Sequence, residues 1–431
     1  MEKQIPEGSK QTEVGIIPED WGVERLGNAI FHIIDNRGKT PPLAKSGHPL
    51  IEVNAIYNQG KTPTLKKVTK YVDDITYSNW FRTGHPHTGD LLIVTVGSPG
   101  TPSYMKGSIG CIAQNIIGLR LKNEHNSEFV YYALCTKTFK KQVQAVLMGA
   151  VQPSLKVPHL QRLSIPLPPI EEQQAIATAL SDVDNLITSL EQLIEKKKAI
   201  KQGTMQELLT GRRRLEGFGE GKGYKQTDLG MIPEDWEVKR LHELGKFQSG
   251  IGFPLYLQGK QQEVIPFYKV SDMNNNGNEV LMLNSNNYIS EKDLMKLGAT
   301  IIPRSSIVFA KIGAALFLER KRILLMDSLI DNNMMAIIAD IDNIDVKYLY
   351  YLLMNTKLSK YANTTALPSI NRNDIGEIKF KIPSLHEQEA ITQVLTNMDT
   401  EIENLEAKVD KYKQIKQGMM QNLLTGRIRL K

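Results

Sequence analysis

Residues 172–215 read EQQAIATALSDVDNLITSLEQLIEKKKAIKQGTMQELLTGRRRL, and residues 387–430 read EQEAITQVLTNMDTEIENLEAKVDKYKQIKQGMMQNLLTGRIRL. Twenty-four of these 44 aligned positions are identical, at a constant offset of 215 residues. The same offset joins EVGIIPEDWGVERL at 13–26 to DLGMIPEDWEVKRL at 228–241. Long self-similarity of this kind indicates an internal duplication. We therefore interpret the 431-residue chain as two fused copies of one unit.

Both repeated stretches carry apolar residues at alternating steps of four and three, the pattern of a coiled-coil seam. A helix from Glu171 to Leu209 would be about 58 Å long at 1.5 Å per residue. Such a long helix with a narrow apolar stripe needs a partner in water, and the nearest partner is its own copy. The predicted seam residues are Ile176, Leu180, Val183, Ile187, Leu190, Ile194, Ile391, Leu395, Met398, Ile402, Leu405 and Val409.

The ends of the two predicted helices also match. Acidic residues such as Glu171 and Glu172 open the first turn, where they favour a helix N-terminus. Gly211 and Gly426 follow the last turns as stop signals. A two-fold relation between the copies would make the pair antiparallel. The alternative is that each stripe faces the core of an ordinary domain, but the length and the duplication favour a coiled-coil spacer with a variable domain at each end.

Between the repeated stretches, residues 31–165 and 246–380 share only a skeleton. HPLIEVNAIYNQG (48–60) parallels IPFYKVSDMNNNG (265–277), and AQN (113–115) resembles IDNN (330–333). Apolar runs at 90–97 and 305–313 predict strands, and the segments 127–146 and 345–362 predict amphipathic helices. The fold class is thus mixed α/β (α+β), with two globular domains separated by a pair of long antiparallel helices. The predicted boundaries are 1–168, 169–212, 213–383 and 384–431.

Basic residues gather with amides and hydroxyls in both variable domains. Residues 31–107 hold nine Lys and Arg against five Asp and Glu. Such side chains contact phosphates and base edges, although a solvated charged surface would look similar in any single cluster. Because both copies carry such clusters, we predict a nucleic-acid face. Its candidate residues are Arg37, Lys39, Asn54, Lys61, Lys66, Lys67, Lys70, Arg82, Lys269, Ser271, Asn274, Lys311, Arg320, Lys321 and Arg322.

The bulk composition is that of a globular protein with a formal charge of +6. Two cysteines without CxxC spacing, Cys111 and Cys135, argue against a disulfide framework or a zinc ribbon and fit a reducing cytosol. No apolar run approaches the roughly 18 residues that a membrane helix needs. We expect a cytoplasmic protein.

No catalytic motif is found in the sequence. Walker A, GxSxG and HExxH patterns are missing, and His85 and His87 lack a third metal ligand. The acids and lysine of PEDWEVK (233–239) resemble a nuclease metal site, but the first copy reads PEDWGVE (18–24). We instead expect Trp21 and Trp236 to anchor the start of each domain against its core, with Pro-Glu-Asp forming a turn.

Two dissimilar domains, each followed by a nearly identical long helix, resemble the specificity subunit of type I restriction-modification systems. The matching phrases are IPEDW at the start of each half, IPLPPIEEQQAI (165–176) and FKIPSLHEQEAI (380–391) before the helices, and KQGTMQELLTGRRRL and KQGMMQNLLTGRIRL at their ends. The resemblance covers essentially the whole chain.

The resemblance implies two target-recognition domains, each reading one half of a split site in double-stranded DNA, with a gap set by the helices. It also implies that the helices bind two modification subunits, which hold S-adenosylmethionine and methylate adenine. Restriction subunits that use ATP and Mg would join the complex. This chain itself would bind no cofactor, carry no catalytic residue and make no membrane contact.

Since the two variable domains differ, the target should be asymmetric, and the two reading domains should lie about one DNA turn, roughly 34 Å, apart. A bivalent protein-binding adaptor on a coiled-coil rod is the alternative, and it predicts no salt-sensitive duplex binding. A self-contained methyltransferase would need an Asn/Asp-Pro-Pro-aromatic motif. The strings at 40–43 and 167–170 lack both the amide or acid and the aromatic residue.

Overall fold

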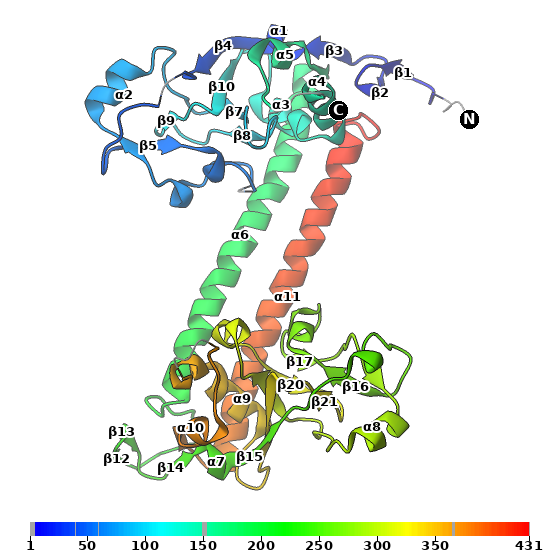
Figure 1. The fold of residues 1–431 in the computed structure, drawn as a ribbon. Helices are drawn as coiled ribbons and strands as arrows, with labels where there is room; N and C mark the ends of the chain where they lie inside the picture. Colours follow the sequence, from blue (N-terminus) through cyan, green and yellow to red (C-terminus); the bar gives the residue numbers. More distant parts are fainter. Residues whose placement is uncertain (1–4, 39, 59, 149–152, 364–366, 431) are drawn as a thin grey trace. The chain divides into compact units, whose positions relative to one another are not determined.

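The structure, a computed structural model, describes residues 5–38, 40–58, 60–148, 153–363 and 367–430. The chain forms two compact units. The first unit comprises Met1–Leu193 and Leu405–Lys431, and the second comprises Ile194–Asn404. Two 39-residue helices, α6 (Ile170–Leu208) and α11 (Leu385–Leu423), each contribute one half to each unit. The globular part of the first unit (residues 9–167) is called the first head, and that of the second (residues 224–382) the second head (Figure 1).

The first head is built on a four-stranded sheet in the order β4-β10-β7-β8 and a three-stranded sheet in the order β6-β5-β9. A terminal hairpin (β1-β2) and a short pair (β11-β3) complete its strands. The strands are β1 (Ser9–Thr12), β2 (Gly15–Pro18), β3 (Gly22–Arg25), β4 (Ile30–Asp35), β5 (His48–Ile51), β6 (Tyr71–Val72), β7 (Leu91–Val94), β8 (Pro102–Tyr104), β9 (Cys111–Ile112), β10 (Ile116–Leu121) and β11 (Ser164–Leu167). The helices are α1 (Leu26–Ala29), η1 (Val53–Ala55), η2 (Leu65–Lys67), α2 (Asp74–Trp80), α3 (Ser127–Leu134), α4 (Lys137–Leu147) and α5 (Val157–Arg162).

The second head repeats this plan with a five-stranded sheet, β15-β22-β19-β20-β17, and a three-stranded sheet, β18-β16-β21. The strands are β12 (Tyr224–Thr227), β13 (Gly230–Pro233), β14 (Glu237–Arg240), β15 (Gly245–Ser249), β16 (Ile265–Tyr268), β17 (Leu281–Met282), β18 (Tyr288–Ile289), β19 (Ile307–Ala310), β20 (Lys321–Leu324), β21 (Leu329–Ile330), β22 (Met334–Ala339) and β23 (Lys379–Ile382). The helices are α7 (Leu241–Leu244), η3 (Leu255–Leu257), η4 (Val270–Asn274), α8 (Glu291–Leu297), η5 (Ala314–Leu318), α9 (Val346–Met354), η6 (Leu358–Tyr361) and α10 (Arg372–Gly376).

Strand pairing shows that the two heads share one framework. In the three-stranded sheets, β5 pairs in parallel with β9 as β16 does with β21, and antiparallel with β6 as β16 does with β18. Strand β17 is an addition in the second head, where it lies parallel to β20. The mixed α/β class is therefore confirmed, and both heads keep their register despite their divergent sequences.

The two long helices run in opposite directions within each unit. In the first unit, Glu172 of α6 pairs with Arg429, and Glu191 with Lys413 at 2.8 Å. A step forward along α6 is thus a step backward along α11. In the second unit, Lys197 pairs with Glu401 at 2.7 Å in the same sense. The antiparallel pairing follows directly from these ion pairs.

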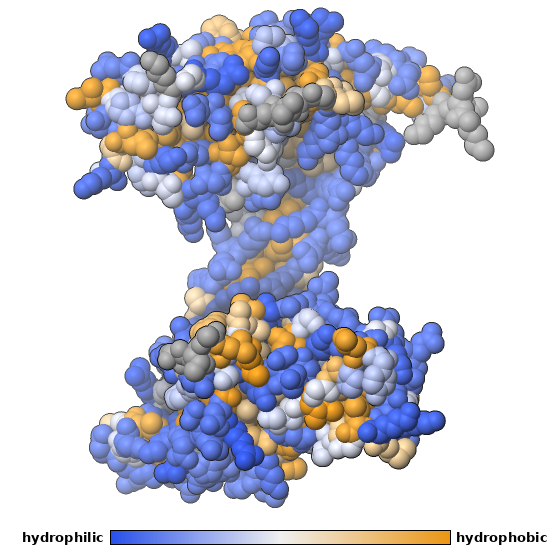
Figure 2. All heavy atoms as spheres, in the orientation of Figure 1, coloured by the Kyte–Doolittle hydropathy of each residue, from blue (hydrophilic) through white to orange (hydrophobic). Residues whose placement is uncertain are grey.

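The predicted seam residues of the two packed helices are shielded from solvent. Ile176, Leu180, Ile391 and Leu395 are 0 to 1% exposed, and the other seam residues are buried or half-buried. Ile176 and Leu180 also join the core of the first head, as Ile391 and Leu395 join that of the second. Figure 2 shows hydrophilic side chains over most of the visible helix surface, with hydrophobic ones between the helices. The seam thus fastens each head as well as the partner helix.

Each head is further fastened by a cluster that we call a clasp. The first clasp contains Asp20, Trp21, Glu172 and Arg429. The Arg429 guanidinium donates to both oxygens of Asp20 (2.8 and 2.7 Å) and to both of Glu172 (2.7 Å each). It also lies 5.6 Å from the ring centroid of the fully buried Trp21, whose Nε1 donates to Glu172 at 2.9 Å. The segment after α11 therefore holds the start of α6.

The second clasp, formed by Asp235, Trp236, Glu387 and Arg214, repeats every one of these contacts at the 215-residue offset. Here the segment after α6 holds the start of α11. The expected anchoring role of Trp21 and Trp236 is confirmed, because both indoles are fully buried. The IPEDW phrase occurs twice because it supplies the acid and the tryptophan of each clasp.

Charge and burial compete in these clasps. Burial alone would raise the pKa of Glu172, but hydrogen bonds from Arg429 and Trp21 outweigh it and hold the pKa below its ordinary value. In the second clasp the hydrogen bonds from Arg214 lower the pKa of Asp235 to about 2. Both carboxylates are therefore ionised at neutral pH, as a bidentate arginine pair requires.

The predicted stop glycines also contact the IPEDW phrase. Gly426 has a φ of +67°, and a Cβ placed there would lie 2.3 Å from the ring of Pro18. Gly211 has a φ of +71° and faces Pro233 in the same way, at 2.7 Å. Only glycine combines this left-handed conformation with so close an approach.

The two predicted head helices are shorter than expected. The segment 127–146 is two helices, α3 and α4, because Thr136 caps a new helix by accepting from the amide of Phe139. The segment 345–362 likewise ends its α-helix at Met354 and continues as η6. Apolar periodicity persisted across both breaks, so the continuous helices predicted from it were wrong. Among the described residues, no helix combines the length and apolar character that would let it span a bilayer.

Candidate nucleic-acid interface

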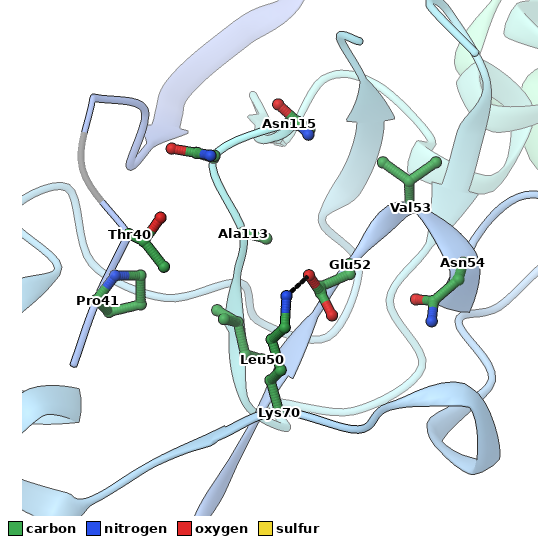
Figure 3. A pocket seen from close by; sticks show the side chains of 10 residues that line it. Thr40, Pro41, Leu50, Glu52, Val53, Asn54, Lys70, Ala113 and Asn115 are labelled. Carbon is green, nitrogen blue, oxygen red and sulfur yellow. Dashed lines mark hydrogen bonds and ion pairs between the residues drawn. The ribbon is translucent and has the colours of Figure 1, made fainter. Parts of the chain in front are cut away.

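Two of the predicted residues of the first head line a cavity of about 270 Å³ (Figure 3). Its lining includes Asn54 and Lys70 from that set, together with Thr40, Pro41, Leu50, Glu52, Val53, Ala113, Gln114 and Asn115. Asn54 Nδ2 donates to the carbonyl of Lys67 at 3.0 Å, which places η2, with its exposed Lys66 and Lys67, beside the cavity. The parallel pair β5-β9 positions the cavity, because η1 and residues 113–115 follow its two strands directly.

The cavity is lined by one acidic and one basic side chain, Glu52 and Lys70. Lys70 Nζ donates to Glu52 Oε1 at 2.8 Å, and the other oxygen of Glu52 accepts no hydrogen bond from the described part of the chain. Gln114 is exposed and Asn115 half-buried, and neither side-chain amide is hydrogen-bonded to a described residue. In Figure 3 Asn115 lies on a different segment from the Glu52–Lys70 pair. Carboxylate, ammonium and amide groups together can pair with any base edge.

Arg37 and Arg82 are joined through Thr83. The Thr83 hydroxyl accepts from the amide of Asp35 at 2.8 Å and donates to Asn36, while Arg37 makes a two-point ion pair with Asp35. Arg82 is exposed next to this joint. Lys39 lies outside the described residues. Thr40 and Pro41, a few residues further along the chain from Arg37, line the cavity.

In the second head Lys269 occupies the position equivalent to Glu52, as the N-cap of the 3₁₀ helix after the central strand. Lys269 Nζ donates to Gln258 at 3.1 Å, and Ser271 is exposed on η4. Arg320 donates to the side chain of Asn274. The amide of Lys311 donates to the carbonyl of Asn333, which lies just beyond β21. Lys269 and Ser271 thus lie together at the start of η4, and Asn274 at its end is paired with Arg320.

Three predicted residues face inward and leave the candidate surface. Lys321 is 1% exposed and donates to Glu319 at 2.6 Å and to the carbonyl of Thr356 at 2.9 Å. Arg322 is 8% exposed and donates to the carbonyl of Lys321. Burial lowers the pKa of both groups. Their strand β20 lies between β19 and β17, so both of its edges are paired.

Lys61 is the third. Its ammonium pairs with Glu128 at 2.5 Å, donates to Ser181 of α6, and lies 5.0 Å from the centroid of the Tyr132 ring. It fastens the first head to α6 and is turned away from the cavity. These three residues were predicted to bind DNA, but their surroundings are those of structural residues.

A sequence model described as the type I restriction modification DNA specificity domain matches residues 18–202 and 233–416. These two matches cover most of the chain. The chain belongs to this family. The duplicated architecture is therefore that of a specificity subunit, the non-catalytic subunit of a type I restriction-modification system.

Curated relatives match along nearly the whole specificity subunit. It is similar to the type I restriction enzyme MjaVIII specificity subunit of Methanocaldococcus jannaschii, with 29% identity over 96% of this chain and 94% of the relative. The EcoBI specificity subunit of Escherichia coli is 23% identical over 85% of this chain and 76% of the relative. The resemblance drawn from the duplicated motifs is thus confirmed.

Solved structures share the fold. The S subunit of a type I restriction-modification system from M. genitalium superposes with a TM-score of 0.53, at 16% identity, over 94% of this chain and 96% of that one. A chain from a study of assembly and conformational transition of the type I system gives a TM-score of 0.55, at 15% identity, over 96% and 99% of the two chains.

No group of three or more potential metal ligands occurs among the described residues of the specificity subunit. His85 Nε2 is hydrogen-bonded to the carbonyl of Tyr77 at 2.8 Å, and the His85 ring stacks on Tyr77 at 3.6 Å. The half-buried His85 therefore packs against an aromatic ring.

Sequence reasoning missed Glu52, Gln114 and Asn115 as members of the cavity. The sequence did contain a signal for them. When HPLIEVN is aligned with IPFYKVS, Glu52 corresponds to Lys269. The alignment of AQN with IDNN marks the segment on the opposite wall of the cavity. Glu52 was missed because it is acidic, whereas the predicted surface was defined by clusters of basic residues. The clasps were missed for a different reason, since Arg429 lies 409 residues from Asp20.

Proposed function

We propose that this specificity subunit reads an asymmetric, bipartite target in duplex DNA, with one head on each half-site. One observation carries the proposal: the two heads keep the same framework, sheet by sheet, while the side chains around the equivalent cavity positions differ. A shared framework allows both heads to approach DNA in the same way, and different side chains select different bases. The exposed Lys66 and Lys67 would add phosphate contacts that do not depend on sequence.

The remaining parts of the proposal concern organisation. Residues 1–168 and 213–383 act as target-recognition domains, and residues 169–212 and 384–431 act as spacer helices that fix the gap. The exposed faces of these helices receive two modification subunits, which hold S-adenosylmethionine. Restriction subunits that use ATP and Mg complete the complex, in the cytoplasm. Support comes from a structural study of complex assembly in a type I restriction-modification system, which contains a chain of this fold.

Salt-dependent binding tests the proposal. The complex of this chain with its modification subunits is titrated with duplex DNA at several salt concentrations. The slope of log K against log salt becomes shallower by about 0.9 for each phosphate that the protein no longer neutralises. Lys66→Ala with Lys67→Ala should therefore reduce the slope by up to about 2. The control replaces two exposed lysines of α4, Lys137 and Lys141, and should leave the slope unchanged.

A wild-type complex that shows no salt-sensitive duplex binding would refute DNA reading and favour the bivalent protein-binding adaptor. An unchanged slope in the Lys66/Lys67 variant, with binding intact, would remove these two lysines from the interface.

A further inference from the structure

Glu52 and Lys269 occupy the same backbone position in the two heads. Each follows the central strand of a three-stranded sheet, β5 or β16, and each caps the 3₁₀ helix that comes next. Their dihedral angles nearly coincide, with φ −106° and ψ 172° at Glu52 and φ −105° and ψ 163° at Lys269. The framework thus presents an acid in one head and a base in the other.

The residues next to this position also differ between the two heads. Lys70, the partner of Glu52, corresponds to Asn287, because their carbonyls accept from the equivalent amides of Leu50 (2.9 Å) and Phe267 (2.8 Å). On the other wall, Ala113 of the first head corresponds to the buried Asp331 of the second. The first head has an acid with a basic neighbour, and the second has a base with an acidic neighbour.

This reversal contrasts with the residues that hold the framework together. The clasps keep Asp, Trp, Glu and Arg unchanged in both copies, since the same contact needs the same groups. A position with fixed backbone and reversed charge cannot serve one shared structural contact. It fits a position at which the two heads meet different ligand groups.

Both side chains retain hydrogen-bonding capacity. Glu52 is 26% exposed, and one carboxylate oxygen is unused by the described residues. Lys269 is half-buried and uses one of its three ammonium donors on Gln258. Gln114 and Asn115 line the cavity with Glu52 in the first head, and the exposed Asn332 and Asn333 follow Asp331 in the second.

An acid in a DNA-facing cavity points to a base edge, because a carboxylate repels phosphate but accepts from exocyclic amines. We propose that Glu52 and Lys269 are specificity-determining residues. Glu52 accepts a hydrogen bond from cytosine N4 or adenine N6 in one half-site, and Lys269 donates to guanine O6 and N7 in the other. This inference rests on the proposed function, since it assigns base contacts to the face that we propose to bind DNA.

Methylated-base sequencing of DNA treated with the reconstituted complex tests the inference. Glu52→Gln replaces a pure acceptor with an amide of the same shape, so the preference at one base pair of one half-site should fall by roughly fivefold or more. Lys269→Gln should do the same in the other half-site only. The wild-type base at the affected position distinguishes cytosine from adenine as the partner of Glu52. Glu7→Gln, an exposed acid in the first unit, is the matched control and should leave the motif unchanged.

Folding is checked by thermal melting, and Glu52→Ala provides a second variant at the same position. If the variants methylate the wild-type motif with unchanged preference at every position, the inference is overturned while the proposed function stands. If the wild-type complex methylates no split site, the proposed function itself fails. A loss of preference in both half-sites from a single substitution would also contradict the assignment.

Discussion

The identity of single residues in the clasps follows from the bonds they make. Arg429 uses its fork on two carboxylates and its flat face on an indole, a combination that lysine cannot reproduce. The same holds for Arg214. Burial of Glu172 and Glu387 is tolerable because each carboxylate is paired and hydrogen-bonded.

Removing Arg429 should loosen the first unit. Arg429→Ala leaves Glu172 buried without its cation, which should cost about 2–4 kcal/mol of unfolding free energy. Arg429→Lys should recover only part of this stability. Hydrogen exchange locates the effect: amides of β2 and β3 should exchange faster, and those of β13 and β14 should not. Arg427→Ala, two residues away and exposed, is the control. Equal loosening of both units would contradict a local clasp.

The second clasp should respond to acid. Since Arg214 lowers the pKa of Asp235 from 3.8 to about 2, this carboxylate stabilises the folded state above pH 4. That stabilisation disappears as the pH falls from about 4 towards 2. The difference in urea midpoint between the wild type and Asp235→Asn should therefore shrink over this range. A difference that stays constant with pH would show that ionisation of Asp235 is not involved.

Among the elements, the long helices were predictable and the breaks in the head helices were not. A seam repeated over many turns fixes a helix from local sequence alone, and the stop glycines mark its end. At Thr136 a single side-chain cap begins a new helix without disturbing the apolar pattern. Likewise LERKRI (318–323) looks like an exposed basic segment, because nothing local reveals that strands pair with both edges of β20.

Gly426 should tolerate no side chain. Gly426→Ala forces a left-handed backbone on alanine and pushes its Cβ into Pro18, at a cost of at least about 2 kcal/mol. Gly418→Ala, inside α11 with open space around it, should instead stabilise by about 0.5–1 kcal/mol. Thermal melting distinguishes the two substitutions. Similar melting temperatures for both would mean that the contact with Pro18 carries no strain.

For the molecule as a whole, duplication explains the conserved and divergent parts together. Residues at clasps and seam must fit a partner in the same chain, so both copies retain the clasp residues and keep an apolar residue at every seam position. This constraint does not apply to the residues around the cavity of the first head or at the matching position of the second, so these residues can differ. The sequence therefore predicted two unlike readers on one framework. It could not predict which side chains converge, because the cavity joins segments around residues 40, 52, 70 and 114.

The spacer role predicts a change in gap length. Removing one heptad from each helix, at facing positions, keeps the seam in register and shortens the pair by about 10 Å. This corresponds to about three base pairs at 3.4 Å per base pair. Methylated sites should keep both half-sites and lose about three base pairs between them. A gap of unchanged length in a folded variant would contradict the role of the helices as a ruler.

The central claim is that each head reads one half-site on its own. Its most direct test is to replace the first head alone with that of a relative whose target differs, and to sequence the adenines methylated by the complex. If the heads read independently, one half of the split motif changes while the other half and the gap remain. A change in both halves, or a methylated site without two separated parts, would contradict it.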